Sequence, residues 1–202
     1  MIWYHGDTSK RSKFSDQKMD RDQHMDPNAM GPGIYWTESK RQAKGYAYPK
    51  GYIYTAEIRT NKVIKDETKP NRAKVKSLIE LAPDLDMALS NFGYDPGYTS
   101  KSAVLKDAID GYMNFSESMI DAALTIYHDF YNRTRANLWA MNMVKVGIDA
   151  FEHKLRELKH LIVYNPKVIK VKKIEAYSEV VDESIELMLS GLPANEVVDR
   201  LI

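Results

Sequence analysis

The fold is decided by residues 33–47, which run GIYWTESKRQAKGYA. Residues 34–36 are β-branched or aromatic and predict a short strand. Thr37 is a good N-cap for a helix that begins near Glu38, and that helix is expected to end near Tyr48, before a proline. The segment therefore predicts a strand that passes directly into a helix.

Outward from this segment, the chain begins with a brief strand at residues 2–5, which is followed by Gly6. Residues 7–32 are polar and close with glycine and proline, and they predict a long loop of the kind that often covers a ligand. Residues 52–58 are aromatic and β-branched and predict a further strand. A glycine that follows His5 lets the main chain approach a ligand closely, while the imidazole can hold a hydroxyl.

The composition indicates one compact domain with appendages. The 202 residues are 44% hydrophobic and 28% charged, which is enough to bury a core. A formal net charge of +1 gives no overall attraction to nucleic acid or to an anionic membrane. The absence of cysteine excludes disulfides, thiolate metal sites and a thiol nucleophile. With neither a signal peptide nor a membrane span in the sequence, we expect a cytoplasmic protein.

The rest of the chain alternates between helical and strand patterns. Apolar residues recur at helical spacing between about 68 and 143, which predicts a helical insertion. Strand patterns return at residues 144–151, 161–164 and 168–174. A helical pattern then predicts a tail over residues 175–202. The expected organisation is one domain over residues 1–174, with the insertion inside it, and this tail.

Together, His5-Gly6, the Gly-Ile-Tyr sequence at 33–35 and Tyr46 resemble the NAD-binding core of the ADP-ribosyltransferases, in the diphtheria-toxin and poly(ADP-ribose) polymerase branch with its His-Tyr-Glu arrangement. The chain is also similar to small transferase domains of bacterial-virus proteins, whose late strand ends in Asn-Pro, as at Asn165-Pro166 here. The resemblance covers residues 2–65 and 144–174. It implies an α+β fold with an ADP-ribosyltransferase-like core of two packed antiparallel sheets around a nicotinamide cleft.

The resemblance also implies roles for single residues, with NAD as co-substrate and no metal. His5 contacts the adenosine ribose, and Gly6 pairs with the nicotinamide amide. Tyr35 and Tyr46 enclose the flat, cationic nicotinamide ring between two aromatic faces, and Thr37 contacts its amide. In the alternative interpretation, His5 only completes a strand and both tyrosines belong to the core.

The third motif residue of the family, a glutamate at the start of a late strand, is missing. Here the matching strand at 161–164 follows His160, and the nearest upstream carboxylate is Glu157. Either Glu157 acts from a shifted loop or His160 takes the position; Glu152 is a weaker alternative in mid-strand. Glu157 is preferred, because a protonated histidine would oppose the positive charge that develops on the sugar. In the alternative interpretation, Glu157 is an ordinary surface glutamate in a hairpin turn. Family members without this glutamate tend toward single transfers or inactivity.

The resemblance thus implies a mono-ADP-ribosyltransferase that moves ADP-ribose from NAD to a macromolecular acceptor, with protein preferred over nucleic acid, in the host cytoplasm if a phage encodes it. Two alternatives stay open. The lysines of residues 167–173 form a basic strand edge that could serve an RNA or DNA modifier. A catalytically inactive interaction module would instead use the helical insertion as its working surface. No metal site is expected, because the histidines lack partners at ligand spacing.

Overall fold

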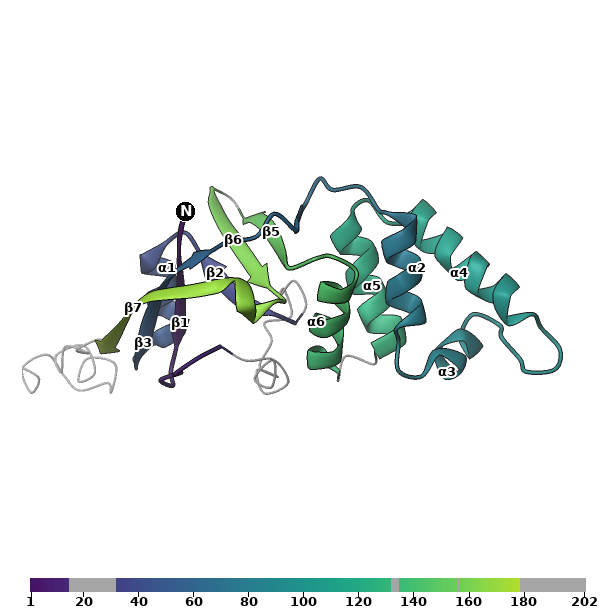
Figure 1. Cartoon of the computed structure of the whole chain (residues 1–202), viewed down its shortest axis with the longest axis horizontal. Coiled ribbons are helices and arrows are strands. Elements are labelled where there is room, and N and C mark those ends of the chain that lie inside the picture. Colours follow the sequence, from purple (N-terminus) through teal and green to yellow (C-terminus); the bar gives the residue numbers. More distant parts are fainter. Residues whose placement is uncertain (15–31, 132–134, 156, 179–202) are drawn as a thin grey trace, which may run out of the picture.

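The structure is a computed structural model that describes residues 1–14, 32–131, 135–155 and 157–178. Figure 1 shows an elongated molecule with a β-sheet at one end and a block of helices at the other, so the chain is α+β, as predicted. Most of the predicted loop at 7–32 lies outside the described residues. The predicted tail does too, apart from residues 175–178, which are strand instead of helix.

Seven strands form one hydrogen-bonded sheet in the order β4-β5-β6-β2-β1-β3-β7. Every neighbouring pair is antiparallel except β4 and β5, which are parallel. The resemblance implies two sheets, whereas the described strands are joined in one. The strands are β1 (Ile2–Asp7), β2 (Ile34–Thr37), β3 (Lys50–Ile58), β4 (Val63–Lys65), β5 (Ala150–Leu155), β6 (Leu158–Val163) and β7 (Ile169–Ser178).

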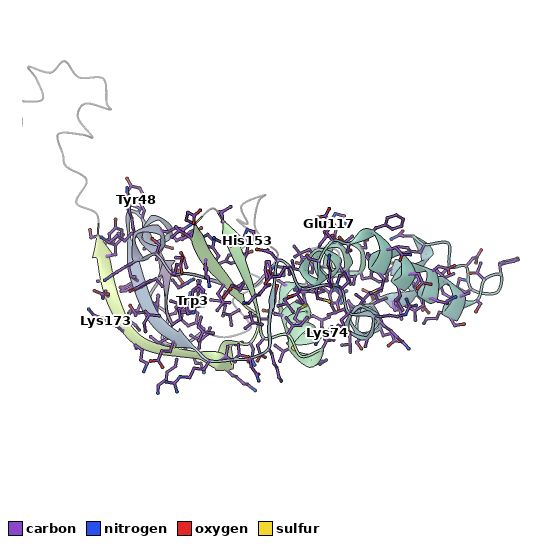
Figure 2. The ribbon with its side chains drawn as sticks, turned by 90° about the horizontal axis from the view of Figure 1, so that it is seen from above. Trp3, Tyr48, Lys74, Glu117, His153 and Lys173 are labelled. Carbon is purple, nitrogen blue, oxygen red and sulfur yellow. The ribbon has the colours of Figure 1, made fainter. Side chains whose placement is uncertain are left out.

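The sheet is nonetheless divided between β1 and β2. Strand β1 pairs with β3 over all of Ile2–Asp7, and β2 pairs with β6 at each of its four residues. Among the described residues, β1 and β2 share the single pair Tyr4 and Thr37. Figure 2 shows the sheet curving around Trp3, which is buried on its inner side. The result is two half-sheets, joined at one point.

Helix α1 (Lys40–Ala47) covers the outer face of this junction. It begins later than predicted, because the Ser39 side chain, and not that of Thr37, accepts the N–H of Gln42 as the N-cap. Ala43 and Ala47 are fully buried in a cluster with Ile53. Small side chains are needed because this helix lies almost against the strand below it.

Five helices, α2–α6, form the block between β4 and β5. Because these two strands are parallel neighbours, the whole block is one crossover connection. The predicted insertion at 68–143 is found at 72–145. The helices are α2 (Arg72–Glu80), α3 (Leu85–Ser90), α4 (Lys101–Phe115), α5 (Met119–Tyr131) and α6 (Ala136–Lys145).

The strand predicted at 144–151 is wrong over residues 144–149. Helix α6 continues to Lys145, because Trp139, Ala140 and Met143 pack into the core at helical spacing, and β5 begins at Ala150. The sheet and the block share one hydrophobic core, in which Trp36 and Phe151 belong to the same cluster as Trp139. The block is therefore packed as part of the fold and does not stand apart from it. None of the helices among the described residues has the length and apolarity to span a membrane.

The closest approach between α1 and the sheet predicts the cost of a methyl group at Gly6. A Cβ there would lie 1.9 Å from the main-chain oxygen of Ala43, so Gly6→Ala must push α1 away and should lower the free energy of unfolding by about 2 kcal/mol. Gly45→Ala is the matched control: it lies in α1 with open space around it, so it should raise stability by about 0.5 to 1 kcal/mol. Urea denaturation measures both. Equal stabilities would show that α1 does not press on β1.

Candidate functional site

The three segments that carry the predicted site residues lie on three neighbouring strands, β1, β2 and β6. Tyr4 pairs with Thr37, and Thr37 pairs with His160. Residues that pair across a sheet share a face, and alternate residues of a strand do too. Gly6, Tyr35, Thr37 and His160 therefore belong to one face of the sheet. It is the face that α1 covers, since Gly6 meets Ala43 of that helix.

Helix α1 turns two different flanks to the sheet. On one flank, Lys40 pairs with Glu175 of β7 at 2.8 Å, and the Nζ of Lys44 lies 5.7 Å from the ring centre of Tyr177 in the same strand. On the other flank, the Thr37 hydroxyl donates to Oε1 of Gln42 at 2.7 Å. This second flank therefore faces β2.

Tyr46 belongs to the flank that faces β2. It follows Gln42 by four residues, and side chains at this spacing lie on one side of a helix. Its side chain is 59% exposed, while Tyr35 of β2 is half-buried. The structure thus places both tyrosines on the same face of the sheet, one on the strand and one at the border of the helix. An exposed aromatic ring in this position is not a core residue.

His5 lies on the opposite face, where β1 and β2 diverge. Its Nδ1 donates to the main-chain oxygen of Tyr35 at 2.7 Å, and so holds β2 where strand pairing has stopped. The imidazole packs among Phe14, Trp36 and Tyr54, with ring centres 5.2 to 5.8 Å away. The structure therefore places His5 at the gap between the half-sheets, but not on the face of the two tyrosine rings.

Asp7 adds a charged group behind His5 that the sequence analysis did not single out. Its carboxylate lies 3.9 Å from Nε2 of His5 and accepts the Ser9 N–H at 2.9 Å and the Nε–H of Arg11. The hydroxyl of Tyr54 accepts the main-chain N–H of Arg11 at 2.5 Å. These bonds fold residues 8–14 over His5. The sequence did contain a signal for Asp7. This acid follows the histidine by two residues, and residues two apart in a strand lie on the same face.

His160 occupies the position next to Thr37. It lies in β6 between Thr37 of β2 and His153 of β5. Burial is the main cause that lowers the pKa of His160; His153 lowers it further, and Glu38 opposes them. The buried Nε2 of His160 has no hydrogen-bond partner among the described residues. The site thus holds a histidine that favours its neutral form and has an unused nitrogen.

Glu38 is a carboxylate of this site that the sequence analysis missed. Its N–H donates to the main-chain oxygen of Lys159 at 3.2 Å, and its Oε1 accepts the N–H of Lys159 at 3.0 Å. These bonds hold the carboxylate beside β6, next to His160. The prediction of a helix from Glu38 hid this role, since a first-turn glutamate is an ordinary helix residue.

The structure does not bring Glu157 or Glu152 to His160. The Glu157 side chain is 94% exposed in the turn between β5 and β6, and its Oε2 lies 3.8 Å from Nζ of Lys154. Glu152 alternates with His153 along β5. Since His153 is the residue paired with His160, Glu152 belongs to the opposite face. Of the candidates for the missing glutamate, only His160 lies beside Thr37.

A buried hydroxyl lies close to Tyr35. Tyr164 is 1% exposed, and its hydroxyl has no hydrogen-bond partner among the described residues. Burial first, and the nearby Tyr35 second, raise the pKa of Tyr164. A buried hydroxyl without a partner is costly. A polar ligand that reached it would remove that cost.

No protein-family model, curated protein or solved structure matches this chain. In the part of the chain that the structure describes, no three histidine, aspartate or glutamate side chains are grouped so that they could hold a metal ion.

The lowered pKa of His160 predicts how stability depends on pH. As pH falls, the unfolded chain takes up its proton near the ordinary histidine pKa of about 6.5, while the folded protein takes it up only at lower pH. The stability that depends on a neutral His160 is therefore complete above the ordinary histidine pKa. It is lost as the pH falls from there toward the lowered pKa of His160 in the folded protein. His160→Gln should make the fall in urea midpoint between pH 7 and pH 5 shallower than in the wild type. Parallel curves for the two proteins would mean that His160 titrates normally.

Proposed function

We propose that this protein is a mono-ADP-ribosyltransferase, which moves one ADP-ribose unit from NAD to a macromolecular acceptor and releases nicotinamide. One observation carries the proposal: the three segments of the resemblance, distant in sequence, lie on adjacent strands, with Gly6, Tyr35, Thr37 and His160 on one face. Tyr46 borders that face from α1. Short motifs that resembled the family only by chance would not need to lie on adjacent strands.

The divergence of β1 and β2 supports a ligand cleft. Main-chain groups of consecutive residues in a strand point alternately to its two neighbours. Beyond Tyr4, β1 therefore directs part of its N–H and C=O groups to the side where β2 has left. In the proposal, Gly6 uses such groups to pair with the nicotinamide amide. The two half-sheets then take the place of the two packed sheets of the family.

The nicotinamide ring would lie between Tyr35 and Tyr46. A cationic, planar ring gains both stacking and cation–π attraction from two aromatic faces. The hydroxyl of Thr37 and the side-chain amide of Gln42, now bonded to each other, offer donors and acceptors for the nicotinamide amide. His5, fixed at the gap between the half-sheets, would contact the adenosine ribose from the other side.

The reaction breaks the bond between the ribose C1′ and the nicotinamide nitrogen. The electron pair leaves with nicotinamide, which becomes neutral, and positive charge develops on the sugar. A nucleophilic group of the acceptor forms the new bond to C1′ and loses its proton. We assign the ribose 2′-hydroxyl to Nε2 of His160, where a neutral imidazole accepts a hydrogen bond without opposing the sugar cation. The Glu38 carboxylate adds negative charge nearby.

A protein acceptor is favoured over nucleic acid. The basic strand that could meet a phosphate backbone is partly neutralised, since Lys172 pairs with Glu57 and Lys173 with Glu175, each at 3.1 Å. Binding to nucleic acid requires unpaired cations that replace counterions. The inactive-module alternative would use the helical insertion as its working surface, and it predicts partner binding that is indifferent to NAD.

Tyr46 offers the cleanest test of NAD binding, because its exposed ring is dispensable for the core. Tyr46→Ala should weaken NAD by about fivefold or more, as expected for the loss of about 1 kcal/mol of stacking. Tyr98→Ala removes a similarly exposed ring from the helical block and should leave affinity unchanged. Calorimetric titration with NAD measures both. Absence of heat from the wild-type protein at millimolar NAD would refute the proposed function.

The second test separates His160 from Glu157 in the chemical step. His160→Ala should slow single-turnover nicotinamide release by about 100-fold, because the contact strengthens as charge develops, whereas Glu157→Gln should stay within about twofold of the wild type. The wild-type rate should rise from pH 5 and level off below the ordinary histidine pKa, since the pKa of His160 is lowered. A large loss in Glu157→Gln with a normal His160→Ala would return the role to Glu157.

A further inference from the structure

A groove of about 520 Å³ runs along the helical block between α4 and α5. It lies at the end of the molecule away from the sheet, where α4 forms the outermost helix in Figure 1. It is thus remote from the proposed NAD site, and nothing in that site explains it. The two helices contribute different chemistry to its walls.

The wall from α4 is apolar. Val104, Ala108, Gly111 and Phe115 line the groove from this helix, at the spacing of one helical stripe. The Phe115 side chain is 88% exposed, and Phe92, which also lines the groove, is 39% exposed. Exposed aromatic rings that line a concave surface are typical of places where another molecule packs.

Gly111 leaves a gap in the wall that α4 forms. It lies inside α4, where glycine costs a helix about 1 kcal/mol relative to alanine. A Cβ at this position would meet no atom within 4 Å, so packing within the chain does not require glycine here. Without a side chain at Gly111, the groove has open space beside α4. This glycine lowers the stability of the helix, and no contact within the chain explains that loss.

The wall from α5 is acidic. Asp121, Thr125 and Asp129 line the groove one turn apart, and Asp107 adds a carboxylate from α4. Asp129 accepts the Tyr112 hydroxyl at 2.7 Å. Among the described residues, Asp107 and Asp121 form no ion pair, and no lysine or arginine lines the groove. The described lining of the groove therefore carries negative charge, and Asp129 also lies 3.0 Å from Nδ1 of His128.

We propose that this groove binds an amphipathic helix of a partner protein, one whose apolar stripe is flanked by arginine or lysine. The apolar stripe of such a helix would pack on Val104, Ala108 and Phe115, and its cations would reach the carboxylates of α5. Arginine would gain further from the rings of Phe92 and Phe115. The proposal stands whether or not the protein transfers ADP-ribose.

Charge argues against residues 179–202 as the occupant of the groove. Residues 179–202 contain apolar residues at helical spacing, but they carry six acidic residues and one basic residue. An acidic segment would meet the carboxylates of the groove and be repelled. The lysines of β7 belong to a strand and therefore offer no helix to the groove.

The test uses two fluorescent helical peptides of about 18 residues, which share one leucine and phenylalanine stripe and differ only in carrying arginine or glutamate beside it. Anisotropy titration with the full chain, without NAD, should show saturable binding of the arginine peptide. The glutamate peptide should bind at least about tenfold more weakly, and salt should reduce the difference. Equal binding of both peptides, or no saturation by the arginine peptide at millimolar protein, would overturn the proposal.

Two variants locate the binding in the groove. Asp107→Asn keeps shape and removes one charge, and should weaken the arginine peptide about threefold or more. Gly111→Leu places a side chain in the open space beside α4 and should weaken binding of the arginine peptide about tenfold or more. Gly111→Ala, which should raise the thermal midpoint, shows whether the helix itself tolerates a side chain. Glu67→Gln, an exposed acid outside the groove, is the control. Unchanged affinity in both groove variants would refute the assignment.

Discussion

Strands β1 and β2 meet at Tyr4 and Thr37, and the rest of the architecture depends on how little they share beyond that pair. A fully paired strand would satisfy its own main-chain groups and leave nothing for a ligand. Here β1 is committed to β3 and β2 to β6, so the sheet remains continuous while its middle opens. His5 steadies the opening by donating to the Tyr35 carbonyl.

The close contact between α1 and β1 gives the candidate site at this opening defined sides. With no side chain at Gly6, the helix main chain lies against the strand, and its two flanks are held by different strands. Lys40 pairs with Glu175 of β7, and Gln42 accepts the Thr37 hydroxyl. These two contacts restrict rotation of the helix and so set the side on which Tyr46 lies. One missing methyl group thus positions an aromatic ring on a neighbouring element.

The helical block has a different relation to the sheet. As a crossover between two parallel strands it could have been a loose appendage, but it buries its inner face in the same core as Trp36 and Phe151. Its outer face keeps an acidic groove that the core does not need. The molecule therefore offers two separate surfaces, one shaped by strand divergence and one by a pair of helices.

Local pattern determined much of this fold in advance. Periodicity and proline chemistry act within a few residues. They account for the strands near 34–36, 52–58 and 161–164, for the end of α1 before Pro49, and for the helical block. Errors arose where long-range packing overrode local preference, as at residues 144–149, where β-branched residues belong to the end of α6 and the turn that follows it.

The sequence by itself therefore determined the elements and the residue types from which a site could be built. Only the tertiary structure decided which of them meet. Strand register placed His160 beside Thr37, and it held Glu38 against Lys159. Register depends on pairing between residues more than a hundred positions apart, and a shift of one residue would reverse every face. No local pattern carries that information.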